Sequence, residues 1–434
     1  MLPPTERLII EPLLLLLIPT RCGMDVVSPL PPLELCEGEF HRRKNDAKRS
    51  GKPAWIWPEV PLGSWAEATD ELATASATVL RGDVAHFSDF EPLTFSLACY
   101  ISGMGPLLGW WLEANALTAP SAVGAVLNAH LHHARNRARY VATMSKFVIA
   151  HLANEGVRPI VLKGGHTAFA YFPDPATRPA SDLDLLVPAA QAAKAESTLA
   201  LAGLRCLSRT RRDSTWAISG ERQEPRSIWL AHAEDPWSVD LHTSLDFSAA
   251  TGAQLVHLDS ADPFSTAIDW PPDHRAKALS QPLQLLQLAV HASGGLQNLT
   301  LLRLVELILV VRRDHKGGRL SWKSFLETAE QTGGLGAAYP ALKMSEKMLP
   351  GIVPKEILDR CNEASPRRVR AIVNKLDPAS AQRVERASIA EHFMWVSGTS
   401  GWLRQLGSDL FPPHSLLSIY QARAYRLLRG KISR

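Results

Sequence analysis

The sequence predicts an α+β protein in which a small mixed-sheet domain is flanked by N-terminal and C-terminal helical regions. Two observations lead to this fold class. Toward both ends of the 434-residue chain, apolar residues recur at three- and four-residue spacings, a pattern typical of packed helices. Between them, short apolar and alternating segments typical of strands are separated by helix-like runs. We therefore divide the chain into an irregular or disordered leader, an N-terminal helical region, an α/β core and a C-terminal helical domain: residues 1–65, 66–156, 157–250 and 251–434.

The leader is set apart by its composition. Residues 25–65 are rich in proline and in charges of both signs, which is typical of irregular chain. The apolar stretch "LIIEPLLLLLIPT" near the start is interrupted by Glu11, Pro12 and Pro19, and it falls short of the ~20 apolar residues of a spanning helix. We therefore expect no association with a membrane.

Cysteine usage and charge limit the class of protein further. The five cysteines are scattered and form no CxxC or Cys/His metal spacing, which predicts reduced thiols in the core of a cytoplasmic protein. Charged residues make up 21% of the chain, and the net charge is +4. This weak basicity argues against a long nucleic acid as partner, but it would not repel an anionic nucleotide.

The N-terminal helical region is expected to hold three to five packed helices, because turn-like Gly, Pro and Asn residues interrupt its apolar pattern. Its last segment contains "HLHHARNRAR", residues 130–139. At helical spacing, the basic side chains of this segment fall around the helix instead of converging. We therefore interpret them as a solvated basic face in preference to a metal or phosphate site.

The α/β core begins with the strand-like "RPIVL" and continues with the helix-like "GHTAFAYF", the alternating "SDLDLLVP" and the helical run "AAQAAKAESTLALAGL". Two further strands are expected at "RSIWLAHA" (226–233) and "PWSVDLHTSL" (236–245). The short turn "EDP" between them predicts an antiparallel hairpin. Beyond residue 275, the segments "PLQLLQLAVHASGG" and "LTLLRLVELILVVRRD" are too long for strands, so we expect core helices there.

Two carboxylates in the strand "SDLDLLVP" are the first functional signal. Successive side chains of a strand point to opposite faces, so Asp182 and Asp184 share one face. Charges within about 5–7 Å of one another repel by roughly 2–3 kcal/mol at an effective dielectric near 20. Oxygen ligands of this kind suit Mg²⁺ or Mn²⁺. The alternative is that Asp182 caps a turn and Asp184 is an ordinary surface residue.

A glycine-containing turn precedes these carboxylates. "LKGG" follows the strand "RPIVL" directly, and glycines let backbone amides approach an anion at a helix N-terminus. Lys163 would add a positive charge beside Gly164 and Gly165, and Arg178 lies just before the carboxylate strand. These four residues are the candidate nucleotide-binding residues.

The segment "SVDLH" supplies a third carboxylate. On this strand Asp240 and His242 share one face, opposite to Val239 and Leu241. Three acidic side chains on adjacent strands are the arrangement that two-metal phosphoryl or nucleotidyl transfer requires. Asp240 would then complete a catalytic and metal-binding set with Asp182 and Asp184. His242 is either an auxiliary catalytic residue or a structural histidine.

The order strand, "LKGG", helix, "RPASDLDLLV", helix, "VDLH" resembles the nucleotidyltransferase superfamily related to DNA polymerase β. Within it, the chain is similar to a group of uncharacterised bacterial nucleotidyltransferase-like proteins, over roughly residues 95–315. The resemblance implies that the triphosphate is held at Gly164 and Gly165. It implies paired metal ligands at Asp182 and Asp184 and a third acid at Asp240. The matches at the remaining positions have no defined role: Lys163, Arg178 and His242.

The implied function is a Mg²⁺-dependent or Mn²⁺-dependent transfer of a nucleoside monophosphate from an NTP to an unidentified hydroxyl acceptor. The acceptor would be a small molecule, a peptide or a protein. Gly165 stands where many superfamily members have serine, which removes one phosphate-binding hydroxyl. Two alternatives remain open at this point: a non-catalytic nucleotide- or peptide-binding module of a biosynthetic or toxin–antitoxin-like assembly, and a phosphotransferase that uses the same metal site.

Overall fold

The computed structural model describes residues 59–210, 212–220, 224–249, 254–296, 299–381, 394–396 and 398–410, with a few residues between 30 and 45. The expected leader lies largely outside these residues, as does the apolar stretch near the start of the chain. Within the described ranges, no helix is both long and apolar enough to cross a membrane.

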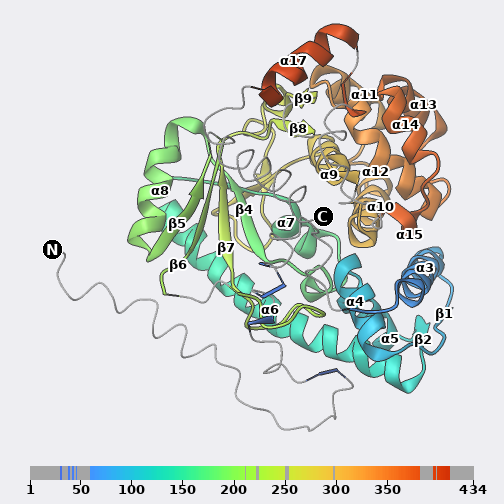
Figure 1. Cartoon of the computed structure of the whole chain (residues 1–434). Helices are drawn as coiled ribbons and strands as arrows, with labels where there is room; N and C mark the ends of the chain where they lie inside the picture. Colours follow the sequence, from blue (N-terminus) through green and yellow to red (C-terminus); the bar gives the residue numbers. More distant parts are fainter. Residues whose placement is uncertain are drawn as a thin grey trace, which may run out of the picture.

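The described part of the N-terminal region contains the helices α3 (Leu62–Arg81), α4 (Pro92–Ser102), α5 (Gly105–Glu113) and α6 (Ser121–Asn154). The short strands β1 (Ala85–His86) and β2 (Leu117–Thr118) pair in parallel beside them. The 34-residue α6 reaches from α5 to the sheet (Figure 1). Its two halves bury different residues. The first half packs Val126 and Leu127 into the core of the helical regions, and the second half packs Val148 and Ile149 under the sheet. A single helix therefore joins the two cores.

A seven-stranded mixed sheet forms the α/β core, with strand order β10-β11-β3-β4-β7-β6-β5. Strand β4 pairs in parallel with β7, as β11 does with β3, and the other neighbours are antiparallel. The strands have these bounds: β3 Ile160–Val161, β4 Asp182–Leu186, β5 Leu204–Arg209, β6 Asp213–Ile218, β7 Ser238–His242, β10 Ile268–Asp269 and β11 Lys277–Ala278. The predicted α+β class with a mixed sheet is confirmed.

The two faces of the sheet meet different partners. Leu183, Leu185 and Val239 point into a core shared with α6 and α8 (Ala192–Leu201). The opposite face of β4 and β7, which carries the aspartates, is turned toward α9 and α10. The C-terminal helices gather beyond it (Figure 1): α9 Leu283–Ser293, α10 Leu301–Lys316, α11 Trp322–Gln331, α12 Leu335–Met348, α13 Lys355–Ala364, α14 Arg367–Val373, α15 Pro378–Ala381 and α17 Gly398–Leu410.

The expected hairpin at residues 226–245 is wrong in its first half. Residues 226–233 form no strand, and β7 pairs with β4 and β6 instead. Side chains bind the backbone of this segment: Ser227 Oγ accepts the N–H of Trp229 at 3.2 Å, and Asp235 accepts the N–H of His232 at 2.8 Å. Such local bonds compete with a strand ladder.

The sheet gains strands that were not expected from the sequence. β5 and β6 form a hairpin in a segment whose many charged and polar residues gave no alternating signal. β5 is an edge strand, and all of its residues after Leu204 are exposed. The short strands β10 and β11 add to the opposite edge, so the expected boundary at residue 250 falls before the last two strands of the sheet.

The basic segment of α6 is not a uniformly solvated face, which corrects the expectation for residues 130–139. His130 and Arg137 are buried. His130 Nε2 lies 2.9 Å from the hydroxyl of Ser96, and Arg137 binds backbone carbonyls at the start of β4 and before β7.

The expectation that the cysteines lie in the core also fails at one position, because Cys206 is exposed.

Close packing of α5 against α6 gives a test of the fold. A Cβ added at Gly109 would lie 2.6 Å from the carbonyl oxygen of Leu127. We expect Gly109→Ala to destabilise the protein by about 1–3 kcal/mol, because the backbones of the two helices must separate. Gly124→Ala on α6 is the matched control: its Cβ would lie 3.7 Å from Leu112 Cδ2, and alanine favours the helix by about 1 kcal/mol.

Thermal unfolding of both variants checks this packing. A melting temperature that falls for Gly109→Ala and holds or rises for Gly124→Ala agrees with the structure. Equal effects of the two substitutions would contradict the close α5–α6 contact.

Candidate active site

Three aspartates lie on one face of two adjacent strands. The parallel register places Asp184 of β4 opposite Asp240 of β7, and Asp182 opposite Ser238. Asp182, Asp184 and Asp240 all line a cavity of about 390 Å³ between the sheet and the C-terminal helices. Adjacent strands run about 4.8 Å apart, so this register concentrates negative charge in a small volume. The structure thus brings together the three carboxylates that the sequence singled out.

Asp184 is the carboxylate with positively charged and hydrogen-bonding partners. Lys163 Nζ donates to Asp184 Oδ1 at 2.8 Å, and His242 Nε2 lies 2.9 Å from the same oxygen. An ionised carboxylate only accepts hydrogen bonds, so Nε2 of His242 carries the proton. Lys163 has φ 46°, a left-handed conformation that is uncommon for a residue other than glycine, at the junction of β3 and α7 (Lys163–Ala170).

The pKa values of the paired aspartates move in opposite directions. Burial, together with the charges of Asp184 and Asp240, raises the pKa of Asp182 to about 6. Burial also opposes ionisation of Asp184, but the hydrogen bond from His242 and the charge of Lys163 outweigh it, so the pKa of Asp184 is lowered. When only one of two neighbouring carboxylates has cationic partners, that one ionises more readily and the other less readily.

Asp240 has a buried oxygen without a hydrogen-bond partner. Among the described residues, no donor reaches its Oδ1. Within that part of the chain, no three His, Cys, Asp or Glu side chains form a group that could hold a metal ion as they stand. The unpaired oxygen of Asp240 and the raised pKa of Asp182 nevertheless indicate an excess of negative charge in this cavity. Carboxylate oxygens of this kind are characteristic ligands of Mg²⁺. The metal role of the three aspartates stays a prediction.

The two glycines of "LKGG" are required by packing. A Cβ at Gly164 would lie 2.7 Å from the guanidinium nitrogen Nη1 of Arg178, and one at Gly165 would lie 2.9 Å from Val161 Cγ1. Gly164 lines the cavity of the aspartates, whereas Gly165 packs toward the sheet and does not line it. The guanidinium of Arg178 therefore occupies space beside Gly164 that was predicted to hold a phosphate.

Arg178 is held by a buried ion pair. Its Nε donates to Glu306 Oε1 of α10 at 3.0 Å, and its Nη1 donates to the carbonyl of Pro179 at 2.8 Å. The hydroxyl of Thr167 on α7 also donates to Glu306. Burial alone would lower the pKa of Arg178, but the charge of Glu306 raises it. Arg178 lines the cavity, although its guanidinium is already bound to Glu306, and its predicted role in nucleotide binding stays a prediction.

Besides Glu306, two site residues were missed in the sequence. Arg303 of α10 and His291 of α9 line the same cavity. Among the described residues, Arg303 Nη1 is buried without a hydrogen-bond partner, and burial and the charge of Arg178 lower the pKa of Arg303. Burial and the charge of Lys163 lower the pKa of His291, so this imidazole is neutral. One signal was available: Arg303 and Glu306 are the charged residues of an otherwise apolar run, residues 301–311, at the start of α10.

A comparison with known families bears on this site. The family model of an uncharacterised nucleotidyltransferase matches residues 102–350, more than half of the chain. The chain belongs to this nucleotidyltransferase family. The matched residues contain "LKGG", all three aspartates and the helices α9 and α10, which supply Arg303 and His291. No curated protein and no solved structure matches the chain. The resemblance to uncharacterised nucleotidyltransferase-like proteins is confirmed, and a nucleotidyltransferase family implies a nucleotide as ligand.

The raised pKa of Asp182 makes the stability of this family member depend on pH. The folded protein retains a proton that the unfolded chain releases between pH 4 and 6, so the contribution of Asp182 becomes less favourable as the pH rises through that window. Asp182→Asn should therefore be more stable than the wild type at pH 8, by on the order of 2 kcal/mol in EDTA, and this gain should vanish near pH 4.

Melting temperatures of wild type and variant across this range measure the effect. Asp359→Asn, on the exposed surface of α13, is the control and should give no pH-dependent gain. A variant that is less stable than the wild type at pH 8 would contradict the excess of negative charge at the site.

The Arg178–Glu306 ion pair gives a second test. Glu306→Gln removes the counter-charge of a buried guanidinium, which is expected to destabilise the protein by roughly 3 kcal/mol. Glu330→Gln is the matched control, because the ion pair of Glu330 with Arg360 is exposed and should contribute less than about 1 kcal/mol. Thermal unfolding compares the two variants, and similar losses in both would show that the buried pair does not hold α10 to the sheet.

Proposed function

We propose that the chain is a Mg²⁺-dependent nucleotidyltransferase that transfers a nucleoside monophosphate from an NTP to a hydroxyl acceptor. The observation that supports this most directly is the register of β4 and β7, which gathers Asp182, Asp184 and Asp240 on one cavity with a buried oxygen of Asp240 unpaired. Three clustered carboxylates disfavour folding, so their presence at one cavity favours a functional role for them.

Cationic side chains in the same cavity fit the triphosphate. Arg303 has a buried guanidinium nitrogen without a partner, and Lys163 stands at the N-terminus of α7, where the helix dipole favours an anion. His291 is neutral and can donate a hydrogen bond without adding charge. In our proposal, Arg303 binds the phosphates that leave as pyrophosphate.

The chain's own groups account for the proton and the bonds of the transfer. The acceptor oxygen attacks the α-phosphorus, its proton passes to the carboxylate of Asp240, and the bond from the α-phosphorus to the bridging oxygen breaks to release pyrophosphate. Lys163 and His242 hold Asp184 ionised throughout. Mg²⁺ bound by Asp182, Asp184 and Asp240 would neutralise the phosphates and lower the pKa of the attacking hydroxyl.

A non-catalytic nucleotide-binding module is the second candidate. It is favoured by the contacts of Asp184, because Lys163 and His242 already supply the neutralising partners that a metal would supply. It is also favoured by the packing of Arg178 over Gly164. The carboxylate of Asp240 speaks against it, because a buried, unpaired carboxylate oxygen destabilises a domain that has no use for it.

Measurements of nucleotide binding and of the reaction product distinguish these two candidates. Calorimetry should detect ATP or another NTP only with Mg²⁺ present, and Asp184→Asn should weaken the binding by about tenfold or more. Asp359→Asn, remote on α13, should bind like the wild type. With water in place of the acceptor, slow turnover should yield AMP and pyrophosphate.

Other outcomes have definite meanings. Release of ADP and phosphate would assign the site to phosphoryl transfer. Metal-independent binding that Asp184→Asn leaves unchanged would favour the non-catalytic module. Failure of the folded wild type to bind any of the four NTPs would overturn the proposed function.

A further inference from the structure

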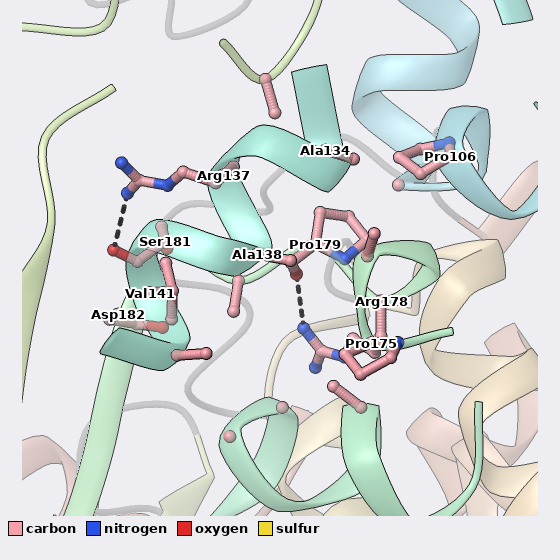
Figure 2. Close-up of a pocket in the computed structure, with 18 of the residues that line it drawn as sticks. Pro106, Ala134, Arg137, Ala138, Val141, Pro175, Arg178, Pro179, Ser181 and Asp182 are labelled. Atoms are coloured by element: carbon pink, nitrogen blue, oxygen red, sulfur yellow. Dashed lines mark hydrogen bonds between the residues drawn. The ribbon is translucent and has the colours of Figure 1, made fainter. Parts of the chain in front are cut away.

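A second cavity, of about 400 Å³, lies against the one that holds the three aspartates. The two cavities share Gly164 and the segment 178–182, so this segment forms a wall between them. The other walls of the second cavity come from α4, α5, α6 and α7 (Figure 2). Asp182 is the one carboxylate of the three that borders both spaces.

Small side chains of α6 create this space. Ala134, Ala138, Ala142 and Ser145 recur at helical spacing along one side of α6, and all of them line the cavity. Figure 2 shows Ala134 and Ala138 on the helix that runs beside the segment from Pro175 to Asp182. With phenylalanine or leucine at these positions, the volume would be filled. The cavity is therefore a property of this helix face.

The charges around the second cavity do not suit a phosphate. Arg137 donates to the backbone carbonyls of Ser181 at 3.3 Å and Pro236 at 2.5 Å, and Arg178 is bound to Glu306. Asp235 adds a carboxylate to the lining. An entering phosphate would meet two arginines that are already engaged and two acids, Asp182 and Asp235. The unpaired guanidinium nitrogen of Arg303 lies in the first cavity instead.

We propose that the second cavity binds the apolar body of the acceptor, a small uncharged alcohol whose hydroxyl passes Asp182, where the two cavities meet, and reaches Asp240 in the first cavity. The inference rests on the proposed nucleotidyl transfer and names its substrate class. A volume of about 400 Å³ is in the range of small-molecule sites and far below a protein interface. Apart from Tyr100, Arg137 and Ser145, the lining from α4 to α7 offers mainly carbon, which favours an apolar ligand over the hydrogen-bonding edge of a nucleobase.

The test uses the full chain and 2-naphthalenemethanol, a neutral primary alcohol with an apolar body, observed by saturation-transfer NMR. Ala138→Phe and the milder Ala142→Leu fill the cavity and should weaken probe binding by about fivefold or more. Lys146→Phe adds the same ring on the exposed side of α6 and should bind the probe like the wild type. Mg²⁺-dependent ATP binding should stay within about twofold in all three variants.

The possible results are distinct. No probe binding by the wild type, or binding that both cavity-filling variants leave unchanged, would overturn the acceptor cavity. ATP binding that falls together with probe binding, in variants with wild-type melting temperatures, would also overturn it and assign the cavity to the nucleoside. Wild-type protein that binds the probe in this cavity but no NTP would instead overturn the proposed nucleotidyl transfer.

Discussion

The buried ion pair between Arg178 and Glu306 is the interaction on which the geometry of the site depends. Arg178 leads into β4, and Glu306 belongs to α10, so the pair joins the sheet to the C-terminal helices. The guanidinium also packs on Gly164 and binds the carbonyl of Pro179, while Thr167 of α7 donates to Glu306. Replacement of a buried pair by apolar residues is often neutral for stability, so the benefit here is positional. One pair fixes α7, the start of β4 and α10 relative to one another.

Charge balance in the aspartate cavity follows from this arrangement. Once α10 is held against the sheet, Arg303 lies across the cavity from the carboxylates, and its pKa is lowered because burial and Arg178 disfavour a further cation there. Lys163 and His242 both act on Asp184. Asp182 therefore carries the unfavourable charge, which its raised pKa expresses. The site separates a stably ionised aspartate from one whose ionisation is disfavoured.

The part of the fold that could be predicted is the part with local signals. "LKGG", the alternation around Asp182 and Asp184, and the helical run of α8 each predict their own structure, and the adjacency of the two aspartate strands follows from their shared polar face, whereas their parallel direction does not. The hairpin β5–β6 could not be predicted, because an edge strand with exposed side chains carries no alternating apolar pattern. Residues 226–233 were mistaken for a strand because buried loops can also be apolar. Arg303 and His291 could not be assigned, since their neighbours in space are distant along the chain.

The wall between the two cavities links the N-terminal helices to the chemistry of the sheet. Arg137 of α6 holds the carbonyl of Ser181, and Arg178, tied to α10, holds the carbonyl of Pro179 (Figure 2). The segment 178–182, which ends at Asp182, is thus held to α6 through Arg137 and to α10 through Arg178. A displacement of α6 or α10 must therefore move the Asp182 backbone or break one of these bonds. Because small residues of α6 line one cavity and charged residues of α10 line the other, the two surfaces can vary independently while the position of Asp182 is preserved.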